Sequence, residues 1–292
     1  MKTDEQVSIA RALVTALPYV QRWGGQRVVI KVGGASMTSD ALIDAVAQDL
    51  VLLRAVGIEV VLVHGGGPAV SEMGRRLGIE PNFVDGLRVT GDDMMRVAQL
   101  VQVGGVSRDL LAAISRYGGS GVGLSGHDGG GWMRGNRRRH VSRETGEPID
   151  LGRVGDIDSV DTRLIDAATA ASVIPVIAPV AVDSDFKPLN VNADSVATAV
   201  AAALNAPRLL FLSDVEGVKG PDGLVSRMKA STARAWIADG TISGGMVPKV
   251  EACLSALESG VRRVSIVDGR QEHASLVELL TKRGVGTLVT AD

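Results

Sequence analysis

Two apolar runs, each followed by a glycine turn, constrain the fold of this chain most. Arg27–Val32 is rich in β-branched residues and leads into Gly33 and Gly34. Glu59–His64 repeats the pattern and leads into the glycines and proline of residues 65–68. Strand, glycine turn and helix in succession predict right-handed crossovers and a largely parallel sheet. Ligands of such sheets bind beyond the carboxyl ends of the strands, where these turns lie.

The second half of the chain continues the alternation of strands and helices. Apolar stretches at residues 173–182, 208–214 and 265–268 are predicted strands, and residues 195–204 form a predicted buried helix of small apolar residues. Asn190, Asn192 and Asp194 precede this helix, whose amino end favours anions. A helix cap explains one of the three polar side chains equally well. Together with the glycine turns, the cluster favours a binding site.

The glycine turns have two interpretations. Glycine serves strand-to-helix turns through positive φ alone, and it also lets backbone N–H groups approach an anion. Neither turn matches the dinucleotide pattern G-x-G-x-x-G or the P-loop pattern. Phosphate binding here therefore needs another arrangement.

Three cationic residues stand where anions are expected. Lys31 lies near the carboxyl end of the first strand. Arg88 lies between apolar residues, where it could bind the carboxylate of a ligand or form a structural salt bridge. Lys249 is close to the start of a helix, where the dipole disfavours a cation. An anionic ligand, Asp194 or Asp214 compensates for it, or its side chain reaches water.

Composition narrows the class of protein. The 292 residues hold 31 Lys and Arg against 33 Asp and Glu, so bulk charge indicates neither a nucleic acid nor a membrane as partner. The single cysteine, Cys253, lies in an Ala- and Leu-rich stretch typical of core packing in a reducing compartment, and we expect the cytoplasm. His127 and His140 have no second ligand at metal spacing, so no protein-built metal site is predicted.

Three segments between the main strands carry their own predictions. Residues 4–23 form an amphipathic arm that Pro18 bends or breaks, packing on its own subunit or on another. Residues 92–117 are predicted to be partly helical with an interruption at Gly104 and Gly105, and residues 132–142 to form a hairpin. The basic run at residues 137–140 is interpreted as a solvated edge rather than a phosphate site.

The candidate residues describe a site for two anions, one of them a polyphosphate. No Ser-His-Asp or Cys-His set for covalent catalysis is evident. Phosphoryl transfer needs no enzyme nucleophile, but it needs cations and N–H donors around the moving group and two substrates in line.

At these motifs the chain resembles the amino acid kinase family, and within it the members that act on N-acetylglutamate. The resemblance covers almost the whole length and rests on the motifs KVGG (31–34), HGGGP (64–68), GLRVT (86–90), NVNAD (190–194), LSDVEGV (212–218) and GGMVPKV (244–250). Residues 16–23 are similar to the amino-terminal arm of hexameric, arginine-regulated members.

The resemblance implies a three-layer αβα sandwich with a mostly parallel central sheet. It implies an arm at 1–25 for oligomerisation, a lobe at 26–180 for the amino-acid substrate and a lobe at 181–292 for ATP. The implied reaction transfers the γ-phosphoryl group of ATP to the side-chain carboxylate of N-acetyl-L-glutamate, in arginine biosynthesis. Mg²⁺ is implied as an ion carried by ATP. A homo-oligomer, either a hexamer built as a trimer of dimers or a dimer, and arginine as an effector are also implied.

The family's functional residues transfer by motif match. The implied catalytic residues are Lys31 and Lys249, with Asp194 holding both lysines. The implied substrate-binding residues are Gly66, Gly67, Arg88, Asn190 and Asn192. The implied nucleotide-binding residues are Gly33, Gly34, Ser213, Asp214 and Lys249.

Departures from the family pattern leave alternatives open. His127 stands where many relatives carry Lys, Gly91 where they carry an acidic residue, and Lys282 and Arg283 where acidic residues often face bound arginine. Like charges there oppose a cationic effector. A sibling kinase for N-acetyl-aminoadipate or a carrier-bound aminoadipate differs by one methylene, which motifs do not resolve. A catalytically silent regulatory homologue is the other alternative, against which the retained lysines and Asp194 speak.

Overall fold

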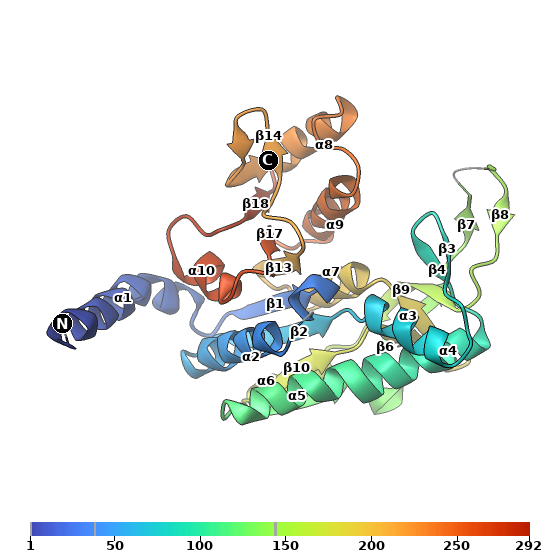
Figure 1. Cartoon of the computed structure of the whole chain (residues 1–292), viewed down its shortest axis with the longest axis horizontal. Coiled ribbons are helices and arrows are strands. Elements are labelled where there is room, and N and C mark those ends of the chain that lie inside the picture. Colours follow the sequence, from blue (N-terminus) through green and yellow to red (C-terminus); the bar gives the residue numbers. More distant parts are fainter. Residues whose placement is uncertain (1, 38, 143–144) are drawn as a thin grey trace.

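The computed structural model describes residues 2–37, 39–142 and 145–292, and its centre is one eight-stranded sheet (Figure 1). The strand order is β16-β18-β17-β13-β1-β2-β10-β5. All neighbours pair in parallel except β17 and β18. The strand bounds are β1 Arg27–Val32, β2 Glu59–His64, β5 Gly121–Leu124, β10 Ile174–Ile177, β13 Arg208–Ser213, β16 Arg227–Lys229, β17 Arg263–Asp268 and β18 Thr287–Thr290.

Helices cover both faces of this sheet. Their bounds are α1 Lys2–Trp23, α2 Asp40–Ala55, α3 Gly67–Arg76, α4 Asp92–Gln99, α5 Ser107–Arg116, α6 Arg163–Ala170, α7 Ala193–Ala203, α8 Ala230–Ala238, α9 Met246–Glu258 and α10 Ala274–Leu280. Helices α2, α5 and α10 pack on one face, and α6, α7, α8 and α9 on the other. The predicted three-layer αβα sandwich with a mostly parallel sheet is confirmed.

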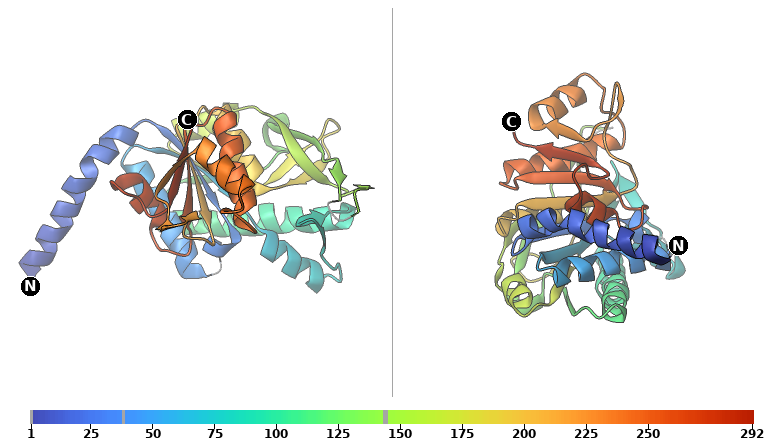
Figure 2. Two further views of the ribbon diagram at one scale, coloured as in Figure 1. Left: turned by 90° about the horizontal axis from the view of Figure 1, so that it is seen from above. Right: turned by 90° about the vertical axis from the view of Figure 1, so that its left-hand side faces the viewer.

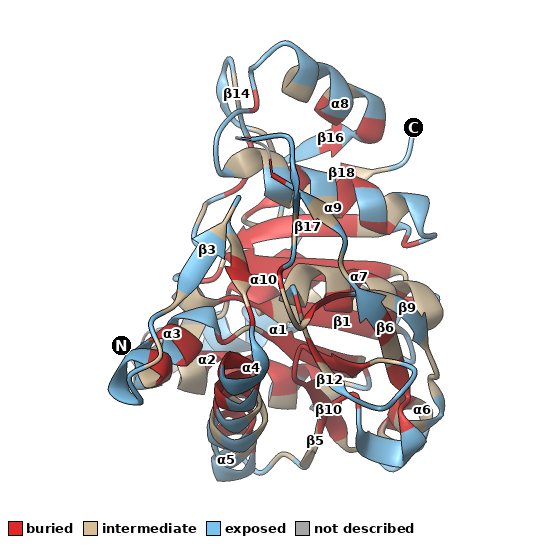
Figure 3. Cartoon of the chain, turned by 90° about the vertical axis from the view of Figure 1, so that its right-hand side faces the viewer, coloured by how far each residue is buried: buried red, intermediate tan, exposed pale blue. Residues whose placement is uncertain are grey.

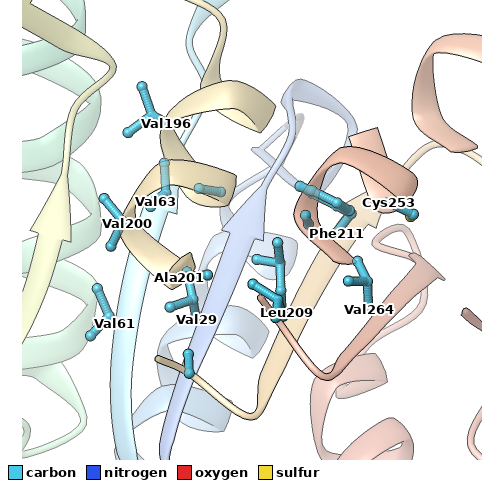
Figure 4. Packing of buried hydrophobic residues seen from close by; sticks show 14 of the residues in the cluster. Val29, Val61, Val63, Val196, Val200, Ala201, Leu209, Phe211, Cys253 and Val264 are labelled. Atoms are coloured by element: carbon cyan, nitrogen blue, oxygen red, sulfur yellow. The ribbon is translucent and has the colours of Figure 1, made fainter. Parts of the chain in front are cut away.

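Alternation along β1 assigns its side chains to the two layers. Val28 and Ile30 join the core under α2 and α5, whereas Val29 joins the core under α7 and α9, as Figure 4 shows for its neighbours Val200 and Leu209. Because side chains of a strand alternate between faces, Lys31 lies on the side of Val29. The position of Lys31 in the alternating pattern of β1 therefore places its side chain on the face that α7 and α9 cover. In Figure 3 most strands of the central sheet are coloured as buried, whereas the outlying β3 is exposed.

Four further strands form a second, separate sheet. The strands β6 Met133–Arg137, β9 Val154–Val160, β11 Val180–Val182 and β12 Pro188–Val191 close on one another. Shorter pairs are β3 Asn82–Val84 with β4 Leu87–Val89, β7 His140–Val141 with β8 Pro148–Ile149, and β14 Lys219–Gly220 with β15 Gly223–Leu224. The predicted hairpin at 132–142 is wrong, because β6 pairs with the distant β9 and β7 with β8. The predicted strand at 173–182 divides into β10 and β11 around Pro179.

The helix after residue 92 runs through its two glycines. The segment Leu100–Val106 is a π-helix that joins α4 to α5 without a break, so the predicted interruption at Gly104 and Gly105 is wrong. A π-helical turn holds an additional residue without ending the helix, and it changes the direction in which the following side chains point. Gln102 is buried in this segment.

Helix α1 projects from the body of the molecule (Figure 2). It continues through Pro18 to Trp23, so the arm does not end at the proline. Ile9, Leu13 and Val14 on this helix are more than half exposed. Its last residue is buried, and the Trp23 indole N–H donates to the Leu279 carbonyl of α10 at 3.0 Å. The arm is therefore anchored at one end and carries an uncovered apolar surface along its length.

The predicted core position of Cys253 is confirmed, since its side chain is fully buried on α9. Burial raises the pKa of the Cys253 thiol. Among the residues that the structure describes, no helix is long and apolar enough to cross a membrane.

Candidate active site

The turns that follow β1, β2 and β13 border one cleft of about 570 Å³. These strands are parallel neighbours in the sheet, so their carboxyl ends meet at one edge. The cleft is lined by Lys31, Gly33, Gly34, Met37, Gly66, Pro68, Ala69, Val106, Ser213, Asp214 and Lys249. Six residues with predicted catalytic or nucleotide-binding roles and one substrate-binding glycine are therefore brought together here.

Lys31 forms an ion pair at the amino end of α7. Its Nζ lies 2.8 Å from Asp194 Oδ1, and its side chain is 14% exposed. Gly33 lies beside it: a Cβ at this position would come within 3.2 Å of Lys31 Nζ and 3.1 Å of the Leu212 carbonyl oxygen. The first glycine turn thus leaves space for the lysine, a reason that positive φ does not supply.

Lys249 is held by the turn after β13. Its Nζ donates to the Ser213 hydroxyl at 2.6 Å and lies 2.9 Å from Asp214 Oδ1. The hydrogen bond from Lys249 holds the pKa of Asp214 below its usual value. Of the three ways to compensate a cation at a helix start, the structure shows Asp214.

The two lysines come from different elements, Lys31 from β1 and Lys249 from α9, and both border one small cavity. Lys31, Asp194, Ser213 and Lys249 also line a small cavity of about 10 Å³, closed by the apolar side chains Phe211, Ala252 and Ile266. One wall is therefore apolar, and charges next to such a wall are screened less than in bulk water. Two ammonium groups at one edge can stabilise a multiply charged phosphoryl group.

The two asparagines before α7 form different hydrogen bonds. The Asn192 side chain caps the helix by accepting from the Asp194 N–H at 2.7 Å and the Ser195 N–H at 3.4 Å. Asn190 donates to the Thr90 hydroxyl at 3.2 Å. The cap fixes the backbone that carries Asp194, so the capping interpretation holds for Asn192.

Arg88 is a buried cation with no carboxylate partner among the described residues. It is 9% exposed, and its Nη2 donates to the Gly67 carbonyl and to the Ser71 hydroxyl, both at 2.8 Å. Its guanidinium lies 4.7 Å from the centre of the Phe83 ring. Its buried Nη1 has no hydrogen-bond partner within the described ranges, and burial lowers the pKa of the guanidinium. No ion pair to Arg88 is found within these ranges, so its buried Nη1 is left as a donor that an anion could satisfy.

The second glycine turn opens α3. The helix begins at Gly67 with Pro68 in its first turn, so its amino-terminal N–H groups lie at the cleft. A Cβ on Gly66 would meet Gln102 Cγ at 3.1 Å. Gln102 is 5% exposed, and its Oε1 has no partner in the part of the chain that the structure describes. Sequence reasoning missed Gln102, because only the π-helical turn places it beside Gly66.

A second cavity of about 440 Å³ continues from Asp214. It is lined by Asp214, Val215, Glu216, Gly217, Lys219, Thr241, Ile242, Ser243, Met246 and Arg270. The motif at 212–218 supplies four of these residues and the motif at 244–250 supplies Met246, although sequence reasoning assigned roles in the two motifs only to Ser213, Asp214 and Lys249. Across the described ranges, no group of three or more His, Cys, Asp or Glu side chains could hold a metal ion.

The parallel sheet, the two lysines at its carboxyl edge and a buried arginine without an ion-pair partner among the described residues define an α/β protein with a cleft suited to anions. The chain belongs to the amino acid kinase family, whose sequence pattern matches residues 26–268.

Named relatives and solved structures agree with this membership. The chain is 50% identical over 284 residues to a protein of Symbiobacterium thermophilum named acetylglutamate kinase, covering 96% of this chain and 97% of the relative. It is 46% identical over 300 residues to the acetylglutamate kinase of Granulibacter bethesdensis, covering 99% of each.

Two solved structures place the fold. N-acetylglutamate synthase of Neisseria gonorrhoeae, complexed with coenzyme A and N-acetyl-glutamate, superposes with a TM-score of 0.84 at 25% identity over 97% of this chain. This chain spans 63% of that synthase. Carbamate kinase of Giardia lamblia bound to AMP-PNP superposes with a TM-score of 0.66 at 16% identity over 92% of this chain and 99% of that one, and shows the fold alone.

Proposed function

We propose that the chain transfers the γ-phosphoryl group of ATP to the side-chain carboxylate of N-acetyl-L-glutamate, in arginine biosynthesis. A P–O bond to the carboxylate forms as the bond to the β-phosphate oxygen breaks, which gives an acyl phosphate and ADP. The activity named for the two relatives above supports this substrate. The observation that carries the proposal is the convergence of Lys31 and Lys249 on one cleft.

The two lysines act on charge rather than as nucleophiles. As the phosphoryl group moves, negative charge spreads over its oxygens, and ammonium groups fixed in advance stabilise that charge without reorganising. Asp194 positions Lys31 through the 2.8 Å ion pair. Lys249 pairs with Asp214 and not with Asp194, so the expectation that Asp194 holds both lysines is met only for Lys31. We propose that bound ATP draws Lys249 toward the phosphates.

Arg88 is the proposed ligand of the substrate α-carboxylate. Its free Nη1 and its fixed Nη2 present a planar fork, which suits a carboxylate. Gly66, Gly67 and Asn190 are the proposed further substrate contacts, and Asn192 supports them as the cap of α7. The carboxylate to be phosphorylated then faces the lysines.

ATP is proposed to lie along the turn after β13. Gly33, Gly34, Ser213 and Lys249 border the cleft on the phosphate side, and Asp214 joins it to the second cavity, which offers both apolar and polar groups to a nucleoside. Mg²⁺ is proposed to arrive on the phosphates, where it would neutralise charge. The substrate lobe at 26–180 and the ATP lobe at 181–292 then meet at β1 and β13.

We propose that α1 joins subunits in a homo-oligomer, a hexamer or a dimer, because its exposed apolar side chains lie on a helix that projects from the body. The cytoplasm stays our proposed compartment. Arginine as an effector is a separate hypothesis, which Lys282 and Arg283 oppose. It is abandoned where millimolar arginine changes neither activity nor thermal stability.

Hydroxylamine trapping of the acyl phosphate, with ATP consumption followed in parallel, tests the proposal. Substrates to compare are N-acetylglutamate, N-acetyl-aminoadipate and unacetylated glutamate. Strong preference for the first is expected. Preference for the aminoadipate derivative selects the sibling kinase, and a lack of turnover with all three selects a carrier-bound substrate or a silent regulatory homologue.

A further inference from the structure

A fully buried histidine lies next to the second glycine turn. His64 is the last residue of β2 and directly precedes Gly65. Both of its ring nitrogens have partners: Nδ1 lies 2.7 Å from the Gly65 carbonyl oxygen, and Nε2 lies 2.7 Å from the Ser107 hydroxyl oxygen. Ser107 is itself only 1% exposed. A satisfied polar chain that is enclosed in this way holds its members in one arrangement.

The partners of His64 decide which ring nitrogen carries the proton. A carbonyl oxygen only accepts, so Nδ1 must carry a proton to bond with Gly65. Burial lowers the pKa of His64 to about 4, so the ring is neutral at pH 7 and Nε2 carries no proton. The Ser107 hydroxyl therefore donates to Nε2, although the Gln102 carbonyl oxygen also lies 3.0 Å from it. Ser107 thus fixes the tautomer that donates to the Gly65 carbonyl.

The bond to the Gly65 carbonyl also determines the direction of the next N–H group. The Gly65 carbonyl and the Gly66 N–H belong to one planar trans peptide unit, in which they point in opposite directions. Because glycine stands on both sides of this unit, the backbone allows both of its orientations. The hydrogen bond from Nδ1 selects the one with the carbonyl toward His64. The Gly66 N–H then points away from His64, and it has no acceptor among the described residues.

The π-helical segment Leu100–Val106 confines the same turn. A Cβ on Gly66 would lie 3.1 Å from Gln102 Cγ and 3.8 Å from Val106 Cγ2. Ser107 directly follows this segment, so the packing against Gly66 and the bond to the histidine come from one helical stretch. Gly66 and Val106 also line the cleft. The turn is therefore held by buried groups where it borders the cleft.

We propose that His64 is a positioning residue for the phosphoryl transfer, which acts through the Gly65–Gly66 peptide to aim the Gly66 N–H into the cleft. The inference rests on the proposed function, in which Gly66 contacts the acid substrate. An N–H group that is aimed in advance stabilises negative charge on a carboxylate or phosphoryl oxygen without turning during the reaction. In this role His64 neither contacts the substrate nor transfers a proton. It keeps one peptide orientation where the glycines allow two.

Asparagine and glutamine at residue 64 separate positioning from packing. The amide nitrogen in His64→Asn stands near the place of Nδ1 and can donate to Gly65, whereas in His64→Gln it stands near the place of Nε2 and faces Ser107. Both variants bury one amide in the same space, so they should lose similar amounts of stability. We expect kcat to fall about 10- to 100-fold in His64→Gln and less than about fivefold in His64→Asn. KM for ATP should change little in either variant.

Val60→Ala is the control for a general loss of stability. Val60 is 1% exposed and lies four residues before His64, on the same face of β2 but at the far end of the strand from the glycine turn. Its truncation should lower the melting temperature and leave kcat almost unchanged. The proposal is overturned if kcat falls as far in Val60→Ala as in His64→Gln, or if the two variants at residue 64 have the same kcat.

Binding of ADP with aluminium fluoride and Mg²⁺ gives a readout without turnover, because the fluoride complex imitates a phosphoryl group in transfer. In calorimetry on the full chain, we expect His64→Gln to bind it about tenfold or more weakly than the wild type and His64→Asn. Affinity for ADP alone should stay the same. If the wild type phosphorylates none of the three acids, the proposed function fails, and this measurement still decides on His64. Equal affinities in all three proteins overturn the proposal.

Ser107→Ala takes the place of His64→Gln if that variant does not fold. Without the hydroxyl, the ring proton is free to move to Nε2, so the Gly65 carbonyl loses its donor for part of the time. We expect kcat to fall about three- to tenfold, together with the affinity for ADP and aluminium fluoride. An unchanged kcat in Ser107→Ala overturns the proposal.

Discussion

Lys249 Nζ lies 2.9 Å from Asp214 Oδ1, so a cation at the start of α9 is compensated by the turn after β13. The Asp214 side chain of this pair is 62% exposed. Exposed pairs contribute little to stability, at about 0–1 kcal/mol. The pairing therefore adds little structural support, which is compatible with the catalytic role proposed for Lys249.

Replacing Lys249 separates catalysis from binding. We expect Lys249→Ala to lower kcat about 100- to 1,000-fold, because it removes a donor that acts on charge developing in the transition state. Calorimetry with ATP should show a change of only a few-fold in Kd. Lys187→Ala, at an exposed residue that lines neither the cleft nor the second cavity, serves as the charge-matched control. Activity that survives the change at Lys249 contradicts the catalytic assignment.

Arg88 should determine the affinity for the amino-acid substrate. We expect Arg88→Ala to raise KM for N-acetylglutamate about 100-fold, because a charge-assisted fork to a carboxylate is lost. Arg88→Lys keeps the charge but not the fork, so it should recover only part of the loss. KM for ATP should stay within a few-fold. Initial rates with each substrate varied provide the measurement, and an unchanged KM for the acid removes Arg88 from the substrate site.

Glycine should be required at residue 33 because a side chain there would collide with its neighbours, and not because of the backbone angle. A Cβ at this residue would lie 3.2 Å from Lys31 Nζ and 3.1 Å from the Leu212 carbonyl oxygen. We expect Gly33→Ala to shift Lys31 and to lower kcat about 10- to 100-fold, since small misplacements of catalytic groups cost rate. Gly57→Ala tests a glycine with open space and positive φ, and there only stability should fall. Kinetics together with thermal melting distinguish the two.

The alternation of strands and helices along the central sheet was predictable, because the apolar pattern of each element is a local property of the sequence. Period-2 alternation is enough to place Lys31 and Val29 on one face. The pairing of β6 with β9 was not predictable, since a strand's partner is chosen by packing across the fold rather than by its neighbours.

The same limit applies to the candidate site. Lys31, Asp194 and Lys249 were found because motifs mark them, and geometry brings the first two within 2.8 Å. Ser71 and Phe83, which hold Arg88, carry no such signal, because they meet it only through the approach of α3 to the β3–β4 pair. An anionic ligand, Asp194 and Asp214 were the alternatives for compensating Lys249, and only the structure selects Asp214 among them.

Stability should depend on pH through His64. Its side chain is fully buried, and burial lowers its pKa from 6.5 to about 4. The unfolded chain therefore binds this proton more readily, so the contribution of His64 is complete above pH 6.5 and is lost as the pH falls toward 4. Between pH 8 and pH 5 this amounts to roughly 2 kcal/mol.

His64→Asn provides the control, since its side chain does not titrate and can still donate to the Gly65 carbonyl, as Nδ1 does now at 2.7 Å. Urea unfolding at several pH values gives the free energy for both proteins. The difference between wild type and variant should shrink by roughly that amount from pH 8 to pH 5. Parallel curves would show that His64 keeps an ordinary pKa.

The apolar surface of α1 should control assembly. Leu13 and Leu17 are 68% and 49% exposed and lie four residues apart, so they share one face of the helix. A glutamate at either position places a charge in any interface formed by that face, whereas Thr15→Glu places the same charge elsewhere on the helix. We expect Leu13→Glu to lower the oligomeric mass measured by light scattering after gel filtration, and Thr15→Glu to leave it unchanged. Because Trp23 anchors the arm independently of these residues, the variant subunit should keep its fold. A mass that both variants leave intact shows that subunits meet through another surface.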